Sequence, residues 1–247
     1  MIDTHAHLDA LDDPEDAVAR ARAAGVTRIL TVGTAPDGWR QSLELAERHE
    51  EVYAILGVHP HEVARVAEGA VREVRRLQSH PKAVAVGEIG LDWYRDYAPH
   101  DDQLRLFEAQ LAMAADIGKP VVIHTRSADE DTLAVLRDFG GTVVLHCFSS
   151  PALLPAALER GWYVSFAGNA TFKNASELRV AAAQVPADRI LAETDTPYLA
   201  PQPVRGRTNE PAYVVHTLAA LAAARGEDAA ELGARIERNA ADCFRLP

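Results

Sequence analysis

The sequence predicts an α/β fold, a (β/α)8 TIM barrel in which residues 1–247 form a single domain. Short apolar, β-branched runs alternate eight times with longer helical patterns, and such runs indicate a parallel sheet covered by helices. Each strand and helix together take about thirty residues, as in a closed eight-stranded barrel. The main alternative is an open doubly wound sheet, which normally has a glycine-rich phosphate-binding turn after its first strand. Here that turn reads His5-Ala6-His7-Leu8-Asp9, so the barrel is favoured.

Each predicted strand is a run of mainly Val, Ile, Leu and Ala, a composition that suits a strand buried on both faces. In chain order the predicted strands cover residues 1–4, 28–33, 52–57, 83–86, 120–123, 142–145, 162–166 and 189–192. No repeat, low-complexity tract or linker interrupts the series. We therefore expect one domain.

The segments between and after these strands have helical patterns and the end signals of helices. Asp13-Pro14 precedes the first segment and Pro36-Asp37 the second, as expected of residues that begin helices. Gly25, Gly118 and Gly161 fall where helices should end. In chain order the predicted helices cover residues 17–24, 39–48, 68–78, 100–117, 128–138, 151–160, 174–184, 210–225 and 228–244.

Composition excludes several classes of protein. An apolar content of 48%, a charged content of 25% and the lack of a run of eighteen apolar residues describe a globular chain without a membrane span. The N-terminus enters a predicted strand at once, so we expect no signal peptide and a cytoplasmic location. Cys147 and Cys243 lack the spacing of a disulfide framework or a zinc ribbon. The net charge of −11 argues against broad electrostatic capture of nucleic acid, although bound cations would offset part of it.

His, Glu or Asp recurs where a predicted strand gives way to a loop, and this recurrence is the chief indication of function. The residues are His5, His7, Glu88, His124, His146 and Asp195. Because side chains alternate along a strand, His5 and His7 share one face. The carboxyl ends of barrel strands form the active-site face. One histidine at a strand end is more often structural, but five such strand ends favour a metal centre.

Four histidines and two carboxylates are too many for one tetrahedral site that keeps an open position. We therefore predict two divalent ions with Glu88 as the bridging ligand. His5, His7 and Asp195 are assigned to one ion, and His124 and His146 to the other. Mg²⁺, Mn²⁺ and Zn²⁺ all suit this mixture of imidazole and carboxylate.

A pair of ions activates water and stabilises the oxygens of a phosphoryl or acyl centre, so hydrolysis is the predicted reaction class. Glu88 and Asp195 are the predicted catalytic residues, with Asp195 hypothesised to accept the proton of the water. Glu193 is equally compatible with metal ligation and with a supporting network. The predicted substrate contacts are His59, Asp92, Arg126, Arg205 and Arg207. Trp93, Tyr94 and Tyr97 offer either stacking faces for a substrate or ordinary loop packing.

These stretches together resemble the TatD family of metal-dependent deoxyribonucleases. The matching segments are residues 2–9, 57–61, 86–92, 120–126, 146–149, 193–199 and 206–211, which run in order along the chain. The resemblance implies a (β/α)8 barrel with a two-metal site built from His5, His7, Glu88, His124, His146 and Asp195. It also implies a substrate, because family members are described as magnesium-dependent exonucleases that trim DNA from the 3′ end.

The sequence leaves alternatives to a nuclease acting on DNA ends. Some relatives in the family are linked to deacylation of D-aminoacyl-tRNA, and the same metals would serve hydrolysis of that ester or of another ester or amide. A non-catalytic metal-binding scaffold is a third interpretation. We predict no membrane partner, and no obligate protein partner is inferred.

Overall fold

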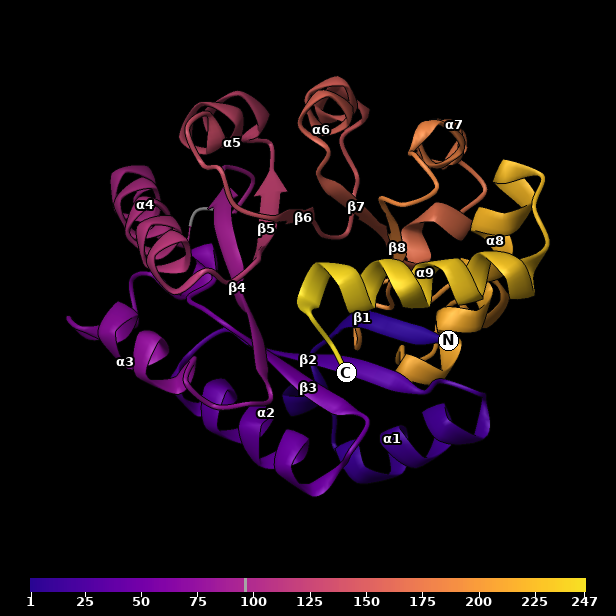
Figure 1. Ribbon diagram of the computed structural model, residues 1–247, viewed down its shortest axis with the longest axis horizontal. Helices are drawn as coiled ribbons and strands as arrows, with labels where there is room; N and C mark the ends of the chain where they lie inside the picture. The colour runs from indigo at the N-terminus through magenta and orange to yellow at the C-terminus, as the bar shows by residue number, and fades with distance from the viewer. Residues whose placement is uncertain (96) are drawn as a thin grey trace. The chain divides into compact units, whose positions relative to one another are not determined.

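The structure is a computed structural model that describes residues 1–95 and 97–247. Within these residues, eight strands form one sheet whose hydrogen-bonded neighbours follow the chain order from β1 to β8 (Figure 1). This order, with helices between the strands, confirms the predicted (β/α)8 barrel. The strands are β1 (Ile2–Ala6), β2 (Arg28–Gly33), β3 (Val52–Leu56), β4 (Ala83–Asp92), β5 (Val121–Arg126), β6 (Val143–Leu145), β7 (Tyr163–Phe166) and β8 (Ile190–Ala192).

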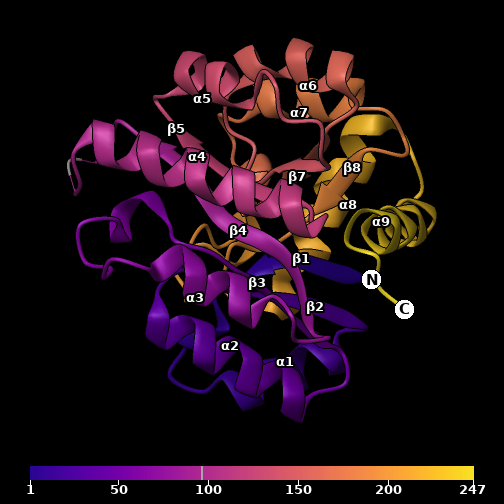
Figure 2. The same ribbon diagram turned by 60° about the vertical axis from the view of Figure 1, so that its left-hand side comes forward.

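The helices follow the predicted segments closely. They are α1 (Pro14–Ala23), α2 (Pro36–Arg48), α3 (Ala70–Leu77), α4 (His100–Ile117), α5 (Asp129–Leu136), α6 (Leu154–Arg160), α7 (Ser176–Gln184), α8 (Val214–Arg225) and α9 (Ala229–Phe244). Asp13 caps α1 by accepting a hydrogen bond from Asp16 N, and Gly118 ends α4 with a positive φ. In the views of Figures 1 and 2, α2 packs against β3 and α4 against β4.

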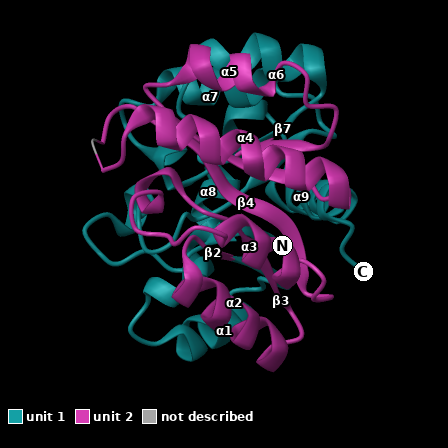
Figure 3. Cartoon of the chain, turned by 90° about the vertical axis from the view of Figure 1, so that its left-hand side faces the viewer, with its two compact units in different colours: residues 1–31, 146–247 teal, residues 32–145 magenta. Residues whose placement is uncertain are grey.

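The chain divides into two compact units, which Figure 3 colours separately. The first comprises residues 1–31 and 146–247, and the second comprises residues 32–145. Leu8, Phe166 and Leu191 are fully buried in the first unit, and Trp39 and Phe107 in the second. The single-domain organisation stays a prediction, which one cooperative unfolding transition would support.

In the first unit, β1 pairs in parallel with β2, and β7 pairs in parallel with β8. An isolated parallel bridge joins Ala6 to Thr196, beyond the end of β8. Asp195 N donates to His5 O at 2.9 Å, and His7 N donates to Thr196 O at 2.8 Å. These bonds set the end of β1 beside the residues that follow β8.

In the second unit, β3, β4, β5 and β6 are consecutive parallel neighbours. The strand β4 is longer than predicted and continues through Glu88 to Asp92, which pairs with Arg126 of β5. Glu88 therefore lies inside a strand, next to a register shift between Val86 and Ile89, and not where a strand gives way to a loop. Pairing with β5 extends the strand past the point where its apolar run ends.

Gly90 allows β4 to approach β5 closely. Its φ is +143°, a backbone conformation that residues with a side chain rarely adopt. A Cβ atom at this position would lie 1.9 Å from the carbonyl oxygen of His124. The extended pairing around Glu88 and His124 therefore requires glycine here.

None of the helices in the described part of the chain combines the length and the apolar character needed to cross a membrane.

Candidate metal centre

The first unit brings His5, His7 and Asp195 together. His5 Nε2 lies 3.3 Å from His7 Nε2 and 4.0 Å from Asp195 Oδ1. His7 Nε2 lies 3.6 Å from the same carboxylate oxygen. The His5 side chain is fully buried, whereas those of His7 and Asp195 are 13% and 12% exposed. The three side chains therefore converge at a point that remains partly accessible to solvent.

His146 joins this cluster. Its ring stacks on the ring of His5, with centroids 3.9 Å apart and an interplanar angle of 17°. One donor atom each from His5, His146 and Asp195 lies within 4.8 Å of the other two. Within the first unit, His146 is therefore placed to share an ion with His5. The assignment of His146 and His124 to one ion, made from the sequence, remains a prediction.

Glu193 holds His146 in place. The Glu193 side chain is buried, and its Oε1 lies 3.0 Å from His146 Nδ1 and accepts a hydrogen bond from Cys147 N at 2.8 Å. Its Oε2 accepts a hydrogen bond from Ser165 Oγ. A carboxylate on one imidazole nitrogen orients the ring so that the other nitrogen, here Nε2, can coordinate a cation. The geometry therefore gives Glu193 a supporting position behind His146.

A network of buried polar groups supports the backbone at Asp195. Asp195 has a φ of +57°, in the left-handed region that is uncommon for residues other than glycine. Asp3 accepts hydrogen bonds from Thr194 N at 2.9 Å, from Thr194 Oγ1 at 2.6 Å and from His5 N at 3.3 Å. Asn209 Nδ2 donates to Thr194 O at 2.8 Å. Such contacts from surrounding residues can maintain an unfavourable backbone conformation at a functional position.

Asp195 is held in its ionised form. Burial alone would raise the pKa of this carboxyl group, but its hydrogen bond to His7 and the nearby His146 and His5 lower it by more. The resulting pKa lies below the ordinary value for aspartate. A carboxylate that is ionised at neutral pH is the form that coordinates a cation.

In the second unit, Glu88 of β4 faces His124 of β5. Glu88 Oε1 lies 2.7 Å from His124 Nδ1 and 3.2 Å from His59 Nε2. The Glu88 side chain is 3% exposed and that of His124 is 17% exposed. Ligand atoms of His59, His61 and His124 all lie within 4.8 Å of one another. The second unit therefore has its own group of imidazole and carboxylate donors.

His59 lies against Glu88, and its protonation state follows from its contacts. Burial lowers the pKa of His59 to about 4, despite the opposing effect of Glu88, so the ring is neutral at pH 7. A neutral imidazole carries one N–H group. Since Nδ1 accepts a hydrogen bond from His61 N at 3.0 Å, the proton is on Nε2, which donates to Glu88. His59, predicted as a substrate contact, is thus placed to orient the Glu88 carboxylate.

Asp92 connects the second cluster to the loop that follows β4. Its Oδ2 lies 2.7 Å from His61 Nε2 and 3.1 Å from His124 Nε2. Its Oδ1 accepts hydrogen bonds from Tyr94 N and Arg95 N, both at 2.9 Å. Burial would raise the pKa of Asp92, but the bonds from His124 and His61 outweigh it and the pKa falls well below its ordinary value. Asp92 is therefore an ionised carboxylate that contacts two histidines and the backbone of the loop.

The three arginines predicted as substrate contacts have different positions. Arg126 ends β5, and its Cζ lies 3.9 Å from the centroid of the Tyr94 ring. Arg205 Cζ lies 4.1 Å from the centroid of the Phe172 ring, and Arg205 also donates to Ala200 O at 3.4 Å. Arg207 is exposed in the segment before α8. Only Arg126 has a described contact with the loop that Asp92 holds.

Sequence reasoning missed several supporting residues. Asp3, Asn209 and Gln103 are buried and hydrogen-bonded to backbone groups near the two clusters. Asp3 and Asn209 lie in stretches that carry the family resemblance, and that was the one available signal for them. Gln103 lies in the helical pattern of α4 and has no local feature that marks it.

The donor sets of both clusters fit divalent cations. Each combines imidazole nitrogens with a carboxylate that is buried and near neighbouring histidines, which suits Zn²⁺ or Mn²⁺ and, through the carboxylates, Mg²⁺. Buried carboxylates facing several imidazoles are also typical of metal sites with a supporting hydrogen-bond shell. The described residues can therefore hold metal in each unit.

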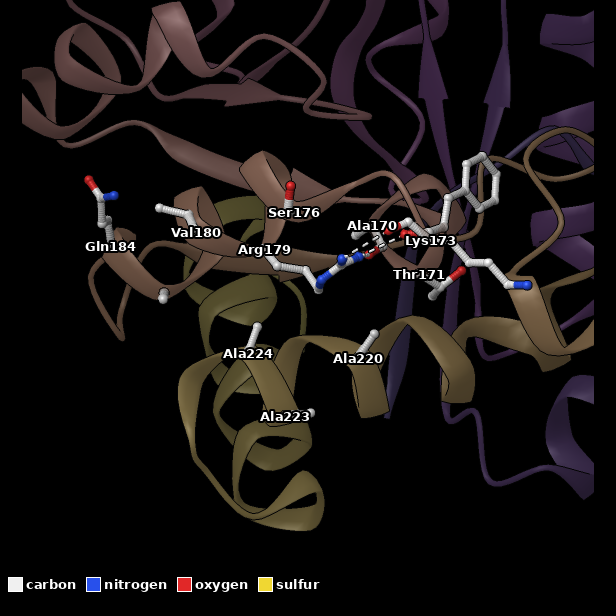
Figure 4. Close-up of a pocket in the computed structure, with 12 residues that line it drawn as sticks. Ala170, Thr171, Lys173, Ser176, Arg179, Val180, Gln184, Ala220, Ala223 and Ala224 are labelled. Atoms are coloured by element: carbon white, nitrogen blue, oxygen red, sulfur yellow. Dashed lines mark hydrogen bonds between the residues drawn. The ribbon is translucent and has the colours of Figure 1, made fainter.

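A separate shallow groove of about 730 Å³ lies along α7 and α8 of the first unit (Figure 4). Arg179 points along it and donates to Ala170 O at 3.0 Å and to Phe172 O at 2.8 Å, as the dashed lines show. None of its described lining residues is a histidine, a cysteine or a carboxylate. The groove is thus distinct from the metal clusters.

Comparison with known proteins shows the family. Residues 2–245 match the model of the family described as TatD related DNase. The chain belongs to this family. That match covers both clusters, from His5 to Asp195, so the candidate metal centre lies wholly within the shared region.

Relatives of this TatD-related chain align with most or all of its length. It is 36% identical over 253 residues to the uncharacterized metal-dependent hydrolase YabD of Bacillus subtilis, covering 100% of this chain and 99% of that protein. It is 37% identical over 243 residues to the 3′-5′ ssDNA/RNA exonuclease TatD of Salmonella typhimurium, covering 95% and 94%.

A solved structure gives the same fold. The TatD homologue YJJV of Escherichia coli superposes with a TM-score of 0.94 at 30% identity, covering 100% of this chain and 98% of that one. An uncharacterized amidohydrolase from Saccharomyces cerevisiae has a TM-score of 0.86 at 19% identity, covering 98% and 99%, and shows the fold alone.

Proposed function

We propose that this protein is a divalent-metal-dependent hydrolase that removes nucleotides from the 3′ ends of DNA. The observation that carries the proposal is the convergence of imidazole and carboxylate donors in each unit, around Asp195 and around Glu88. The bond class and the direction of cleavage are supported by family membership and by the 3′-5′ exonuclease named among the relatives. A cytoplasmic location stays a prediction from the sequence.

We infer two ions per chain, each Mg²⁺, Mn²⁺ or Zn²⁺. His5, His7 and Asp195 would hold one ion, and His124 and His146 would hold the other, as the sequence predicts; the stacking of His146 on His5 also allows His146 to serve the first ion. The proposal that Glu88 bridges the ions rests on its bidentate carboxylate and on its position on the fourth strand, which is central among the ligand-bearing strands of the sequence. Bound cations would polarise the phosphoryl oxygens and lower the pKa of water at the scissile bond.

The protein's own side chains would then orient the metal ligands and accept the proton of the attacking water. Asp195 is ionised, so its carboxylate oxygen can accept the proton of the attacking water. His59 Nε2 holds Glu88 from one side, and Glu193 holds His146 through Nδ1. His59 and Glu193 thus keep Glu88 and His146 in position, and neither takes part in the proton transfer.

A direct assay distinguishes the substrates. Protein stripped of metal and reloaded with Mg²⁺, Mn²⁺ or Zn²⁺ is offered end-labelled single-stranded DNA and a D-aminoacyl-tRNA in parallel. We expect stepwise loss of nucleotides from the 3′ end of the DNA, restored by metal. Deacylation of the tRNA without release of nucleotides would overturn the proposal.

The role of Asp195 is tested by Asp195→Asn, which keeps the shape of the side chain. Because a positioned base typically contributes about 10²- to 10⁴-fold to rate, turnover should fall by that factor while metal content is retained. Exposed Glu159 of α6 provides the matched control, and Glu159→Gln should leave the rate unchanged. Full activity in Asp195→Asn would contradict this role, and inactivity of the wild type under every metal would favour a non-catalytic scaffold.

The bridging role of Glu88 is tested by counting bound metal. If Glu88 contributes to both ions, Glu88→Ala should lose activity and weaken binding of both equivalents in equilibrium dialysis. His124→Ala should weaken one equivalent only. Equal losses in the two variants would refute the bridge, and DNA cleavage by Glu88→Ala would refute the site assignment.

A further inference from the structure

The loop after β4 gathers exposed aromatic rings and guanidinium groups. Tyr94 is 60% exposed and Tyr97 is 54% exposed. Arg95 Cζ lies 5.4 Å from the centroid of the Tyr94 ring and 6.0 Å from that of Tyr97. Arg126 Cζ lies 3.9 Å from the Tyr94 centroid. We call Tyr94, Arg95, Tyr97 and Arg126 the aromatic rim. More than half of each tyrosine is thus exposed to solvent.

The aromatic rim adjoins the second cluster. Asp92 accepts hydrogen bonds from Tyr94 N and Arg95 N through one carboxylate oxygen and faces His61 and His124 through the other. The Tyr97 ring meets the His61 ring edge-on, with centroids 4.8 Å apart. A molecule that contacts the rim therefore lies beside residues that are placed to hold metal.

Contacts hold the described residues at both ends of this loop. Gln103 of α4 accepts a hydrogen bond from Asp92 N at 3.0 Å and donates to Ala98 O at 3.0 Å. Trp93 N donates to Arg126 O at 2.9 Å, and the Trp93 ring stacks on His100 with centroids 3.7 Å apart. A surface ordered in advance loses little conformational entropy when it binds a ligand.

The chemistry of the rim identifies its ligand. Exposed aromatic rings stack on the faces of nucleobases, and guanidinium groups bind phosphates and stack on the same rings. A base inside a duplex has both faces covered by its neighbours, so only an unpaired base can use such a ring. We propose that the aromatic rim binds unpaired terminal nucleotides of a single strand, with bases stacked on Tyr94 and Tyr97 and phosphates held by Arg95 and Arg126. This inference rests on the proposed function and assigns the binding of the strand end to these four residues.

Steady-state kinetics of the metal-loaded enzyme on a single-stranded DNA test the rim. Replacing Tyr94 and Tyr97 together by Ala should raise KM at least about tenfold, as loss of base stacking does, with little change in kcat and unchanged metal content. The matched variant with Phe at both positions keeps the rings and should keep the wild-type KM. Val180→Ala, an exposed apolar position on α7, controls for general surface effects. A KM that rises equally in the Ala and Phe variants would overturn the proposal.

A substrate change provides the complementary measurement. A strand whose terminal residues are abasic should bind wild-type enzyme more weakly than the intact strand, whereas the double Ala variant should not distinguish the two. If the abasic change weakens both proteins by the same factor, the bases do not stack on these rings and the proposal fails.

A binding assay separates failure of this inference from failure of the proposed function. A single strand with phosphorothioate linkages and terminal 2-aminopurine is titrated with metal-loaded protein, and stacking quenches its fluorescence. Quenching by wild type and by the Phe variant, but not by the double Ala variant, supports the rim even if no DNA is cleaved. Cleavage by wild type without such quenching overturns the rim and leaves the nuclease proposal standing.

Discussion

Replacement of Glu193 tests whether the metal centre depends on the carboxylate behind His146. In Glu193→Ala three donors lose their acceptor: His146 Nδ1–H, Cys147 N–H and Ser165 Oγ–H. Each buried donor left unpaired costs about 1–3 kcal/mol, and two of these three hydrogen bonds are buried, so the free energy of unfolding should fall by at least ~2 kcal/mol. Glu193→Gln keeps the size and one acceptor oxygen of the side chain. Its stability should therefore change much less.

Measurement of metal affinity should separate the contribution of Glu193 to metal binding from its contribution to folding stability. Loss of a carboxylate that orients a histidine ligand typically weakens metal binding by about 10- to 100-fold, which corresponds to about 1.4–2.8 kcal/mol. We expect this loss in Glu193→Gln, measured by competition with a chelator, alongside urea unfolding of the metal-free protein. Glu159→Gln on the surface of α6 is the control and should match the wild type in both assays. Wild-type metal affinity in Glu193→Gln, or wild-type stability in Glu193→Ala, would refute the reasoning.

Three further outcomes are expected. Gly90→Ala should lose about 3–5 kcal/mol of unfolding free energy in urea titrations, because its new methyl would overlap a backbone oxygen of β5; a loss below 1 kcal/mol would contradict the close approach. Gln103→Leu should increase amide hydrogen exchange in the loop after β4, and unchanged protection there would show that the loop is ordered without it. Burial would raise the pKa of Glu227, but hydrogen bonds from Arg225 and Arg235 lower it by more. Stability from a lowered carboxyl pKa is present above the unfolded value and lost as pH falls through the folded one. Glu227→Gln should thus lower the unfolding free energy at pH 7 by under ~1 kcal/mol and have no effect at low pH. An equal effect at both pH values would argue against the pairing of Glu227 with Arg225 and Arg235.

Element boundaries were predictable where local signals are strong. The helix α4 covers the same residues, 100–117, as the predicted segment, because Gly118 ends it with a positive φ. The strand β2 also matches, since its apolar run has clear ends. The end of β4 did not match, because its last residues are strand only through pairing with β5. The local sequence pattern of β4 gives no information about its pairing with β5.

The candidate ligands were predictable for a related reason. His5 and His7 share a strand face by alternation, and parallel strands end on one side of a barrel, so residue type and position were enough to name them. The supporting residues were not named, because their roles depend on distant partners. Glu193 contacts His146 across 47 positions in the chain, and Thr194 donates to Asp3 across 191.

The sequence by itself determined the alternation of strands and helices, the family and the candidate metal ligands. These properties depend on local periodicity and on the chemical type of each residue, both of which are visible along the chain. Only the tertiary structure decided which carboxylate orients which histidine, the tautomer of His59, and the exposure of Tyr94 and Tyr97 beside Asp92. Hydrogen-bond partners and solvent exposure are set by packing between distant segments, so no local pattern specifies them.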